Sequence, residues 1–373
     1  MKVLHVIPSV GEQSGGPATA IFPMCRALMQ QGIEVVLATT DAGLQQHEAA
    51  EHKGVSTKFF PAQLGESFKY SRPLAAWLTA NIRDFDLAHI HAVFNHSSVA
   101  AARVCRQAGI PYVVRPLGTL DPWSLAQKSL RKRVFWQISG REMLQGAAAV
   151  HYTSEAEKLG TERFTRMNHG KVIPLGIETV IGTDPVTDYF PDLAGDPYVL
   201  VLSRLHPKKA LDVLLDAFLA LTEDIRFAGW RLMLAGDGPS DYVAKLKSKA
   251  VASSRVLFTG WVDGEKKHAL LRRASLLALP SHQENFGLCV MEAMSHAVPV
   301  LVSPNVNLAP EIASVNAGWI SAIHRDALIE KLAEALSDTE ELAKRGRAGK
   351  QLSVQYSWEN VARSLVDLYR SIL

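Results

Sequence analysis

Hydrophobic and polar positions alternate along the chain between short apolar runs and amphipathic segments. The apolar runs predict buried strands, whereas apolar residues spaced by three and four positions predict helices. In the amino-terminal half we expect strands at 2–7, 34–39, 87–91, 112–115, 150–153 and 171–173, and helices at 18–30, 74–82 and 99–108. Strand and helix in alternation are typical of a parallel sheet covered by helices, so the pattern predicts an α/β fold.

The same alternation continues in the carboxyl-terminal half. Strands are expected at 198–203, 275–279 and 298–302, and helices at 211–221, 288–296, 325–336 and 339–354. Between the halves, 174–197 is rich in proline, glycine and aspartate and predicts a linker. A chain of 373 residues is too long for one ordinary core. We therefore expect domains at 1–185 and 186–356, followed by an amphipathic helix at 357–373.

Two carboxylates flank a predicted junction between loop and helix. Glu284 precedes the helix and Glu292 lies in its second turn, after a loop that leaves the carboxyl end of a strand. Open α/β sheets bind ligands at that edge, and the free N–H groups of Phe286, Gly287 and Leu288 favour an anion such as a diphosphate. Carboxylates accept hydrogen bonds from hydroxyls, so the ligand would be a nucleotide-sugar. Taken on spacing alone, such a pair is more often a helix contact and a solvated loop residue.

Basic residues follow the strand expected at 198–203. Arg204 offers a planar fork and Lys209 a point charge, and both lie just before an amphipathic helix. A basic loop of this kind is usually a solvated turn. In the same half-chain as Glu284 and Glu292, it predicts a second wall of a phosphate site.

Four blocks of this sequence resemble the retaining glycosyltransferases of family 4. They are Ser-Arg-Leu-His-Pro-Lys-Lys at 203–209, Glu-x7-Glu at 284–292, Leu-Ala-Gly-Asp-Gly-Pro at 234–239 and Gly-Gly-Pro at 15–17. The resemblance implies the GT-B fold, in which two Rossmann-like domains face each other across a cleft and the last helix crosses back to the first domain. It also implies transfer of a hexose from a UDP- or GDP-linked sugar to an acceptor hydroxyl.

The resemblance also assigns roles to single residues. His91, Arg204, Lys209 and Glu284 would be catalytic. In the family reading Glu292 holds the ribose, Glu284 the donor sugar, and Val262 lies near the base. The remaining donor contacts would be Gly15 and Gly16, which lack a Cβ and so allow backbone to approach the ligand, and Phe286, Gly287 and Leu288. The leaving phosphate would receive the acceptor proton on the same face of the sugar.

Neither a metal nor a cofactor is expected. His89 and His91 form a His-x-His pair, but spacing along the chain offers no third ligand. Asp84 and Asp86 form an Asp-x-Asp triplet, which in another glycosyltransferase fold holds a divalent metal; here it precedes a strand and should lie on the surface. With Arg204, Lys209 and a helix terminus available for the phosphates, the nucleoside-diphosphate sugar is a substrate and no metal is required.

A basic and aromatic segment at 121–136 has two interpretations. It combines four cations with three aromatic residues, and such a segment can lie on an anionic membrane with the aromatics at headgroup level. The acceptor would then be lipid-linked, as in similar bacterial surface-polysaccharide transferases, with Arg115 facing it. Equally, the aromatics could be core residues and the cations solvated. The cations are Lys128, Arg131, Lys132 and Arg133, and the aromatics Trp123, Phe135 and Trp136.

The composition of the chain bears on its partners and its location. With 40 basic and 37 acidic residues, the formal charge of +3 indicates no nucleic-acid partner. Three scattered cysteines predict reduced thiols, and no apolar run reaches the roughly 20 residues that span a bilayer, so we expect a cytoplasmic protein, peripheral on the inner membrane face if 123–136 binds lipid. A nucleotide-sugar epimerase, a glycan phosphorylase and a non-catalytic nucleotide-sugar-binding or scaffold subunit remain open.

Overall fold

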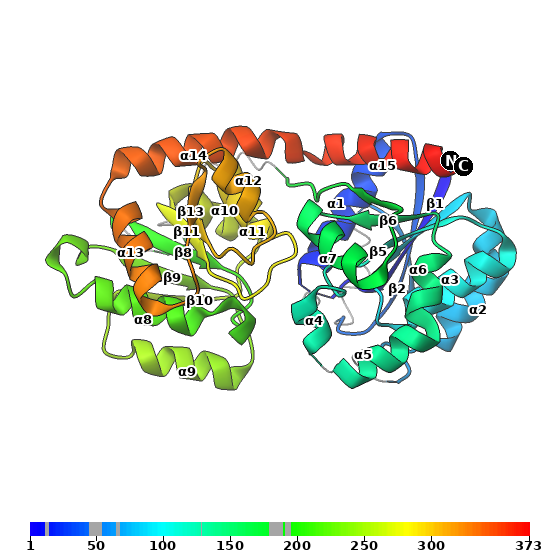
Figure 1. The fold of residues 1–373 in the computed structure, drawn as a ribbon, viewed down its shortest axis with the longest axis horizontal. Helices are drawn as coiled ribbons and strands as arrows, with labels where there is room; N and C mark the ends of the chain where they lie inside the picture. Colours follow the sequence, from blue (N-terminus) through cyan, green and yellow to red (C-terminus); the bar gives the residue numbers. More distant parts are fainter. Residues whose placement is uncertain (12–14, 45–53, 65–67, 128, 179–188, 191–194) are drawn as a thin grey trace. The chain divides into compact units, whose positions relative to one another are not determined.

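The computed structural model describes residues 1–11, 15–44, 54–64, 68–127, 129–178, 189–190 and 195–373. It divides the chain into two compact units (Figure 1), one formed by Met1–Gly176 with Trp358–Leu373 and the other by Ile177–Ser357. The boundary expected at 185/186 lies outside the described residues, because 179–188 are not among them. The last helix begins at Trp358 and belongs to the first unit.

The first unit is built on a sheet of 7 strands in the order β3-β2-β1-β4-β5-β6-β7. Every pairing in this sheet is parallel. The strands are β1 Lys2–Ser9, β2 Glu34–Thr40, β3 Ser56–Phe60, β4 Leu87–His91, β5 Tyr112–Arg115, β6 Ala149–Tyr152 and β7 Gly170–Val172. The strand order reverses between β1 and β4, which places a topological switch point there.

Helices cover this sheet, and one core lies between its strands and α2 and α3. The helices are α1 Gly16–Gln30, α2 Arg72–Asn81, α3 His96–Ala108, α4 Pro122–Ala126, α5 Ser129–Phe135, the π-helical turn Trp136–Gly140, α6 Arg141–Gln145, α7 Glu155–Thr165 and α15 Trp358–Ile372. Asn95 caps the amino terminus of α3, because its side chain accepts from the Ser98 N–H at 2.9 Å, and Gly109 caps the carboxyl terminus with φ 71°. Helix α15 packs along α1 (Figure 1).

The second unit has a sheet of 6 parallel strands in the order β10-β9-β8-β11-β12-β13. They are β8 Tyr198–Leu202, β9 Arg231–Ala235, β10 Val256–Gly260, β11 Leu276–Leu279, β12 Val300–Val302 and β13 Gly318–Ile320. The helices are α8 Leu211–Leu221, α9 Ser240–Ala250, α10 Gly264–Arg273, α11 Leu288–Ser295, α12 Ala309–Ser314, α13 Arg325–Leu336 and α14 Thr339–Ser353.

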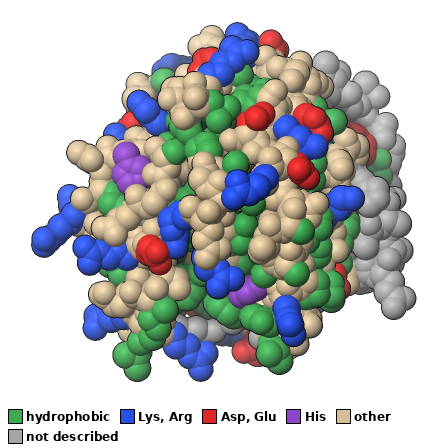
Figure 2. Space-filling model, turned by 90° about the vertical axis from the view of Figure 1, so that its right-hand side faces the viewer, with side chains coloured by type: hydrophobic (Ala, Val, Ile, Leu, Met, Phe, Trp, Pro, Cys, Tyr) green, Lys and Arg blue, Asp and Glu red, His purple; other side chains and the backbone are tan. Residues whose placement is uncertain are grey.

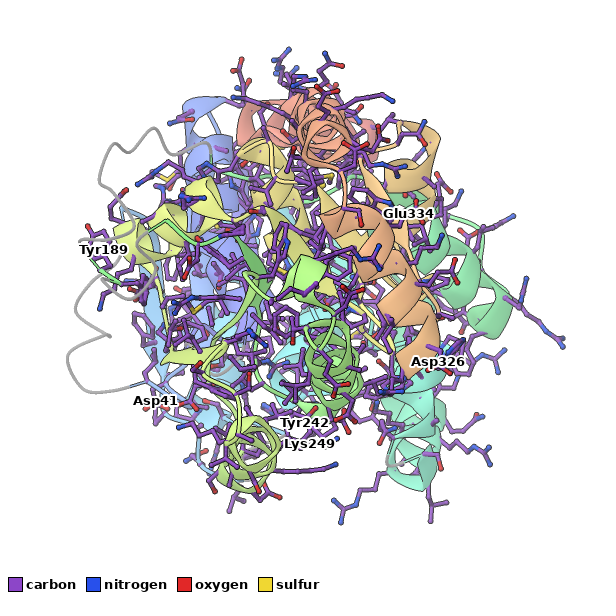
Figure 3. All side chains as sticks on the ribbon, turned by 90° about the vertical axis from the view of Figure 1, so that its left-hand side faces the viewer. Asp41, Tyr189, Tyr242, Lys249, Asp326 and Glu334 are labelled. Carbon is purple, nitrogen blue, oxygen red and sulfur yellow. The ribbon has the colours of Figure 1, made fainter. Side chains whose placement is uncertain are left out.

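The core of the second unit lies between the sheet and helices α8, α9 and α13. Polar contacts tie the outer helices together. The Tyr242 hydroxyl of α9 donates to Asp212 of α8 at 3.3 Å, and Lys249, seven residues further along α9, pairs with Asp216 of α8. Tyr242 and Lys249 are labelled in Figure 3. On α13, Glu334 accepts a hydrogen bond from the Trp319 indole at 2.9 Å.

The α/β class with two parallel, Rossmann-like sheets is confirmed. Strand β3 was not expected, since Ser56–Phe60 is only half buried and lacks a continuous apolar run. The strand expected from Val298 begins at Val300. Among the described residues, no helix combines the length and apolar character needed to cross a membrane.

Candidate functional site

The strand order of the second sheet brings two functional loops together. Strands β8 and β11 are adjacent, and the sheet order reverses between them, so the loops that leave their carboxyl ends flank a switch point. The backbone joins these loops directly, because the His282 N–H donates to the Lys208 carbonyl at 2.8 Å. The segments predicted as two walls of one site are therefore neighbours.

Lys209 and Glu284 form an ion pair across this switch point. Their side chains are only 13% and 18% exposed. Burial alone would raise the pKa of the Glu284 carboxyl, but the charge and hydrogen bond of Lys209, with help from Lys208 and Arg204, outweigh burial and lower it. Glu284 is therefore a carboxylate at neutral pH and can accept hydrogen bonds from hydroxyl groups.

The backbone of Glu284 is held by a third loop. Its N–H donates to the Asn305 carbonyl at 3.1 Å, and its carbonyl accepts from the Asn307 N–H at 3.0 Å. These bonds form a parallel bridge to the segment after β12. The loop after β12 thus holds the backbone of Glu284, and Lys209 holds its carboxylate. Together these contacts fix the direction of the side chain.

Glu292 pairs with a residue that sequence reasoning missed. Its carboxylate lies 2.7 Å from the Lys267 ammonium of α10, and both side chains are at most 20% exposed. The alternative of a contact within its own helix is therefore not what the structure shows. The two residues are 25 positions apart, so only the packing of α10 beside α11 brings them together.

Gly287 caps the amino terminus of α11, and its backbone lies in the left-handed region, with φ 76°. A Cβ at this position would lie 3.3 Å from the Cγ of Glu284 and from Val290, so glycine keeps the turn close to the carboxylate. Phe286 is 3% exposed and its ring packs near Tyr356, while Val262 in the loop after β10 is 7% exposed. The N–H groups of Gly287 and Leu288, three and four positions after Glu284, stand at the start of the helix and have no partner within its hydrogen-bond ladder.

The turn after β9 supports the basic loop. The Leu205 N–H donates to the Asp237 carbonyl at 2.8 Å, and a Cβ on Gly236 would lie 1.9 Å from the Ser203 carbonyl oxygen. Gly238 has the same relation to the Leu205 carbonyl, also at 1.9 Å. The two glycines let the turn pack directly on 203–205. Arg204, at the centre of that loop, is left exposed.

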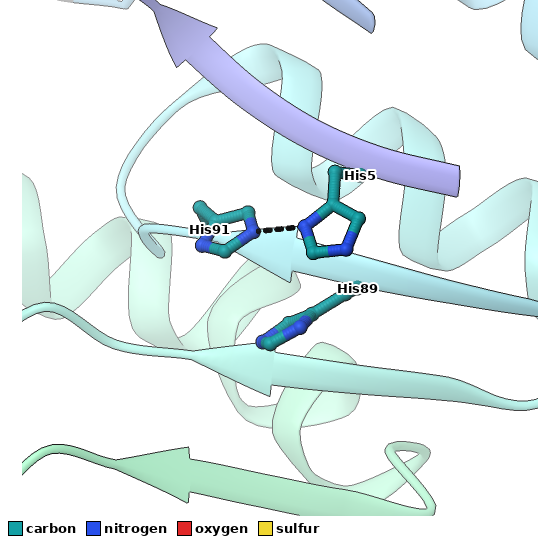
Figure 4. A group of neighbouring side chains, drawn as sticks. All are labelled: His5, His89 and His91. Carbon is teal, nitrogen blue, oxygen red and sulfur yellow. Dashed lines mark hydrogen bonds between the residues drawn. The ribbon is translucent and has the colours of Figure 1, made fainter. Parts of the chain in front are cut away.

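In the first unit, the switch point between β1 and β4 carries histidines (Figure 4). His91 ends β4, and its Nε2 lies 3.0 Å from Nδ1 of His5 on β1. Spacing along the chain pointed to no third partner for His89 and His91, whereas the fold brings in His5 from 86 positions away. The three side chains are fully buried, and their candidate ligand nitrogens lie within 4.8 Å of one another.

The geometry of this cluster fits a hydrogen-bonded chain better than a metal centre. His89 uses both nitrogens, one 2.7 Å from the Tyr369 hydroxyl of α15 and one 3.2 Å from His151. The rings of His89 and His91 stack with an interplanar angle of 23°, and with both of its nitrogens already engaged His89 has no lone pair left for a metal. Burial, followed by the charge of Arg115, lowers the pKa of His5 and of His151 to about 3, and those of His89 and His91 also fall well below the usual value. All four imidazoles are neutral at pH 7.

Arg115 lies inside the first unit, at 1% exposure. Burial lowers its pKa to about 10, partly offset by the charge of Glu157, so it stays protonated at neutral pH. Glu157 is also fully buried and accepts from the N–H groups of Gly118 at 2.6 Å and Thr153 at 2.8 Å. A buried guanidinium near a buried carboxylate serves the fold, and the expected role of Arg115 at an acceptor stays a prediction.

The glycine loop follows the carboxyl end of β1, whereas the aspartate triplet precedes the amino end of β4. Gly15 adopts φ 71° and its carbonyl accepts the first hydrogen bonds of α1, which begins at Gly16, as expected for a backbone turn before a helix. Asp84 and Asp86 are exposed before β4, and Asp86 accepts from the Lys2 N–H at 2.7 Å. The triplet is thus on the surface, as predicted.

Of the aromatic residues at 123–136, only Trp136 is buried among the described ones, whereas Trp123 and Phe135 are half buried. Trp136 is 9% exposed within the core of the first unit, and Phe135 packs against that core, so the expectation of a ring at headgroup level is wrong for Trp136. Lys132 donates to the Ser124 carbonyl and lies over the Phe94 ring, while Arg131 and Arg133 are exposed. Lys128 lies outside the described residues.

Family models match both units. The model for "Glycosyl transferase 4-like domain" matches residues 15–176, and that for "Glycosyl transferases group 1" matches residues 191–352. Among curated proteins, the GDP-mannose:cellobiosyl-diphosphopolyprenol alpha-mannosyltransferase of Xanthomonas campestris is 27% identical, and the alignment covers 100% of this chain and 97% of that protein. An uncharacterized glycosyltransferase of Methanocaldococcus jannaschii and a D-inositol 3-phosphate glycosyltransferase of Nocardia farcinica are each 29% identical, but their alignments span only 44% and 41% of those proteins.

Solved structures share the fold. Anabaena Alr3699/HepE in complex with UDP and glucose has a TM-score of 0.81 at 21% identity, with 100% of both chains covered. The sucrose-phosphate synthase of Thermosynechococcus elongatus has a TM-score of 0.80 at 18% identity, covering 100% of this chain and 99% of that one.

Proposed function

Because the chain belongs to the GT-B glycosyltransferases of family 4 type, we propose that it transfers a hexose from a nucleoside-diphosphate sugar to an acceptor hydroxyl with retention at the anomeric carbon. The observation that carries this proposal is the Lys209–Glu284 pair at the switch point of the second sheet. It places a cation for phosphate and a carboxylate for hydroxyls beside the amino terminus of α11.

The donor contacts follow from the positions of these groups. The diphosphate lies against Arg204, Lys209 and the first-turn N–H groups of α11, while Glu284 accepts hydrogen bonds from the sugar. The ribose lies at Glu292, whose partner Lys267 orients the carboxylate. The base lies near Val262. Before the donor binds, Glu284 neutralises Lys209, so the site does not hold an unpaired buried charge.

In the reaction, the bond from the anomeric carbon to the diphosphate oxygen breaks and a bond to the acceptor oxygen forms on the same face. The acceptor proton passes to the departing diphosphate oxygen, so the charges balance without a protein nucleophile. Arg204, Lys209 and the backbone amides stabilise the negative charge that grows on the leaving group. Glu284 is held by Lys209, and burial raises the pKa of Cys289 to about 12, so neither of these neighbours is an evident nucleophile.

The relatives narrow the substrates to be tested first. The Xanthomonas protein that aligns over the full chain is named for GDP-mannose and for a diphosphopolyprenol acceptor. The similar Anabaena fold was solved with UDP and glucose. We take a GDP- or UDP-linked hexose as donor and a lipid-linked saccharide of a surface polysaccharide as acceptor, reached at the inner face of the cell membrane through the region of 123–136.

The test is a calorimetric and thermal-shift screen against UDP, GDP, ADP and their common sugar conjugates. One ligand should bind the wild type, and Arg204→Ala and Glu292→Ala should weaken it at least tenfold. Arg347→Ala, which removes an exposed cation of α14, is the matched control and should bind normally. If no nucleotide binds at millimolar concentration, the transferase is refuted in favour of a scaffold subunit, and an inverted product anomer would refute retention.

A further inference from the structure

We propose that the outward face of α5 and of the π-helical turn after it docks on the surface of an anionic lipid bilayer. This proposal rests on the proposed lipid-linked acceptor and identifies the surface that brings the enzyme to it. The face differs from the one expected from the sequence, because Trp136 is buried in the core and aliphatic side chains are exposed in its place.

Three large aliphatic side chains are exposed on one face of this helical run. Leu130, Val134 and Ile138 are 74%, 51% and 71% exposed. They are spaced by four residues across α5 and the π-helical turn, so they lie on one side of the run as successive turns of a helix. A soluble surface carries single exposed apolar residues without consequence, but a row of three within nine positions indicates a partner that removes them from water.

The charge around this row favours an anionic partner. Residues 122–141 contain no aspartate or glutamate, whereas Arg131, Arg133 and Arg141 are exposed. The next acidic residue, Glu142, is paired with Arg106 at 2.7 Å. Apolar side chains flanked by arginines are the composition of helices that lie in the interface of anionic membranes. In Figure 2, hydrophobic and basic side chains lie next to one another along the lower edge of the first unit.

A shallow groove continues the apolar row. Its volume is about 530 Å³, and the exposed side chains of the row form part of its wall, so a lipid chain can enter it beside them. It is lined mainly by Phe68, Val99, Leu130, Val134, Phe135 and Ile138. An apolar groove beside arginines matches a phospholipid, which has a hydrocarbon chain next to a phosphate. A nucleic acid has no apolar chain to fill it, and a second copy of this strongly basic face would be repelled.

The test is co-sedimentation with vesicles of phosphatidylcholine alone and of phosphatidylcholine with phosphatidylglycerol. The wild type should bind the anionic vesicles at least tenfold more tightly than the neutral ones, and less tightly as salt rises. The double variant Leu130→Gln/Ile138→Gln should lose at least tenfold, and Arg131→Gln/Arg133→Gln should lose the preference for anionic vesicles. The matched control is Ile225→Gln, which removes an isoleucine that is 85% exposed in the second unit and should bind as the wild type.

The outcomes separate this proposal from the proposed function. Glutamine favours helices, and the changed side chains are exposed, so the variants should fold and bind the nucleotide-sugar normally. The docking surface is overturned if the wild type does not bind anionic vesicles, or if the Leu130→Gln/Ile138→Gln variant binds them as tightly as the wild type does. Neither result would affect nucleotide binding. A wild-type dimer in light scattering that Ile138→Gln dissociates would also overturn it, because a second copy would then cover the face. Vesicle binding without any nucleotide binding would instead overturn the transferase.

Discussion

The buried histidines of the first unit predict a steep loss of stability in mild acid. His5, His89, His91 and His151 are fully buried, and burial with the nearby charge of Arg115 lowers the pKa of each one far below that of an unfolded chain. When the folded pKa is the lower one, the unfolded state binds more protons as the pH falls through about 6.5. Stability is therefore fully present above that pH and is lost below it, down to the folded pKa of about 3 for His5 and His151.

The size of the loss follows from the number of protons. Between pH 7.5 and 5.5, protonation of one histidine of pKa about 6.5 stabilises the unfolded state by about 1.4 kcal/mol. A histidine that stays neutral in the folded state gives no such gain to the fold. Four such residues together lower the free energy of unfolding by roughly 5.5 kcal/mol, comparable to the whole stability of many domains, which is about 5 to 15 kcal/mol. Carboxylates contribute little in this range, because their unfolded pKa values lie near 4.

The assay is urea unfolding of the wild type at pH 7.5, 6.5 and 5.5. In the variant His5→Gln, one of four titrating groups is gone, so the loss between pH 7.5 and 5.5 should shrink by about 1.4 kcal/mol, whatever the variant's absolute stability. His282→Gln, which removes an exposed imidazole, is the control and should keep the wild-type dependence. Equal stability at pH 7.5 and 5.5, or the same pH dependence in His5→Gln and wild type, would refute the neutral buried cluster.

Three further changes test the second site and the last helix. Lys209→Met leaves Glu284 unpaired and should lower the free energy of unfolding by about 1 to 3 kcal/mol. The double variant Lys209→Met/Glu284→Gln should recover part of this loss, and a double variant no more stable than the single one would contradict the pairing. Gly236→Ala forces a Cβ against the Ser203 carbonyl and should weaken nucleotide binding in calorimetry, while Gly229→Ala, with open space around it, should be tolerated. Tyr369→Phe removes the hydroxyl bonded to His89 and should cost about 1 kcal/mol in thermal unfolding, and an unchanged midpoint would show that this bond contributes nothing.

The sequence signals of the candidate site in the second unit are local. Apolar runs predict strands β8 and β11, and the loops that follow these strands contain Arg204, Lys209 and Glu284. Their direct contact could not be predicted from the pattern, because it requires β8 and β11 to be neighbours although β9 and β10 lie between them in the chain. The partner Lys267 was missed for the same reason, since a lysine on an amphipathic helix carries no sign of which carboxylate it will meet.

The first unit shows where local signals mislead. Trp136 and Phe135 next to four cations looked like a membrane surface, but the position of the helix on the core turns these rings inward. The aliphatic row at Leu130, Val134 and Ile138 was visible in the sequence at a spacing of four, yet such spacing is equally typical of a buried face. Only the packing of α5 against the unit decides which face is exposed, and no alternation of residue types contains that information.

The two sheets share one strand order but carry opposite chemistry at their switch points. In the second sheet, the switch point has Arg204, Lys209 and a helix amino terminus, which suit a diphosphate. In the first, the histidines are held neutral, and Arg115 is offset by buried Glu157, so this position adds little net charge. A neutral imidazole can exchange hydrogen bonds with an uncharged hydroxyl, whereas an imidazolium would add a positive charge near that of Arg115. The burial that holds the histidines neutral at pH 7 is therefore also what makes them costly in acid.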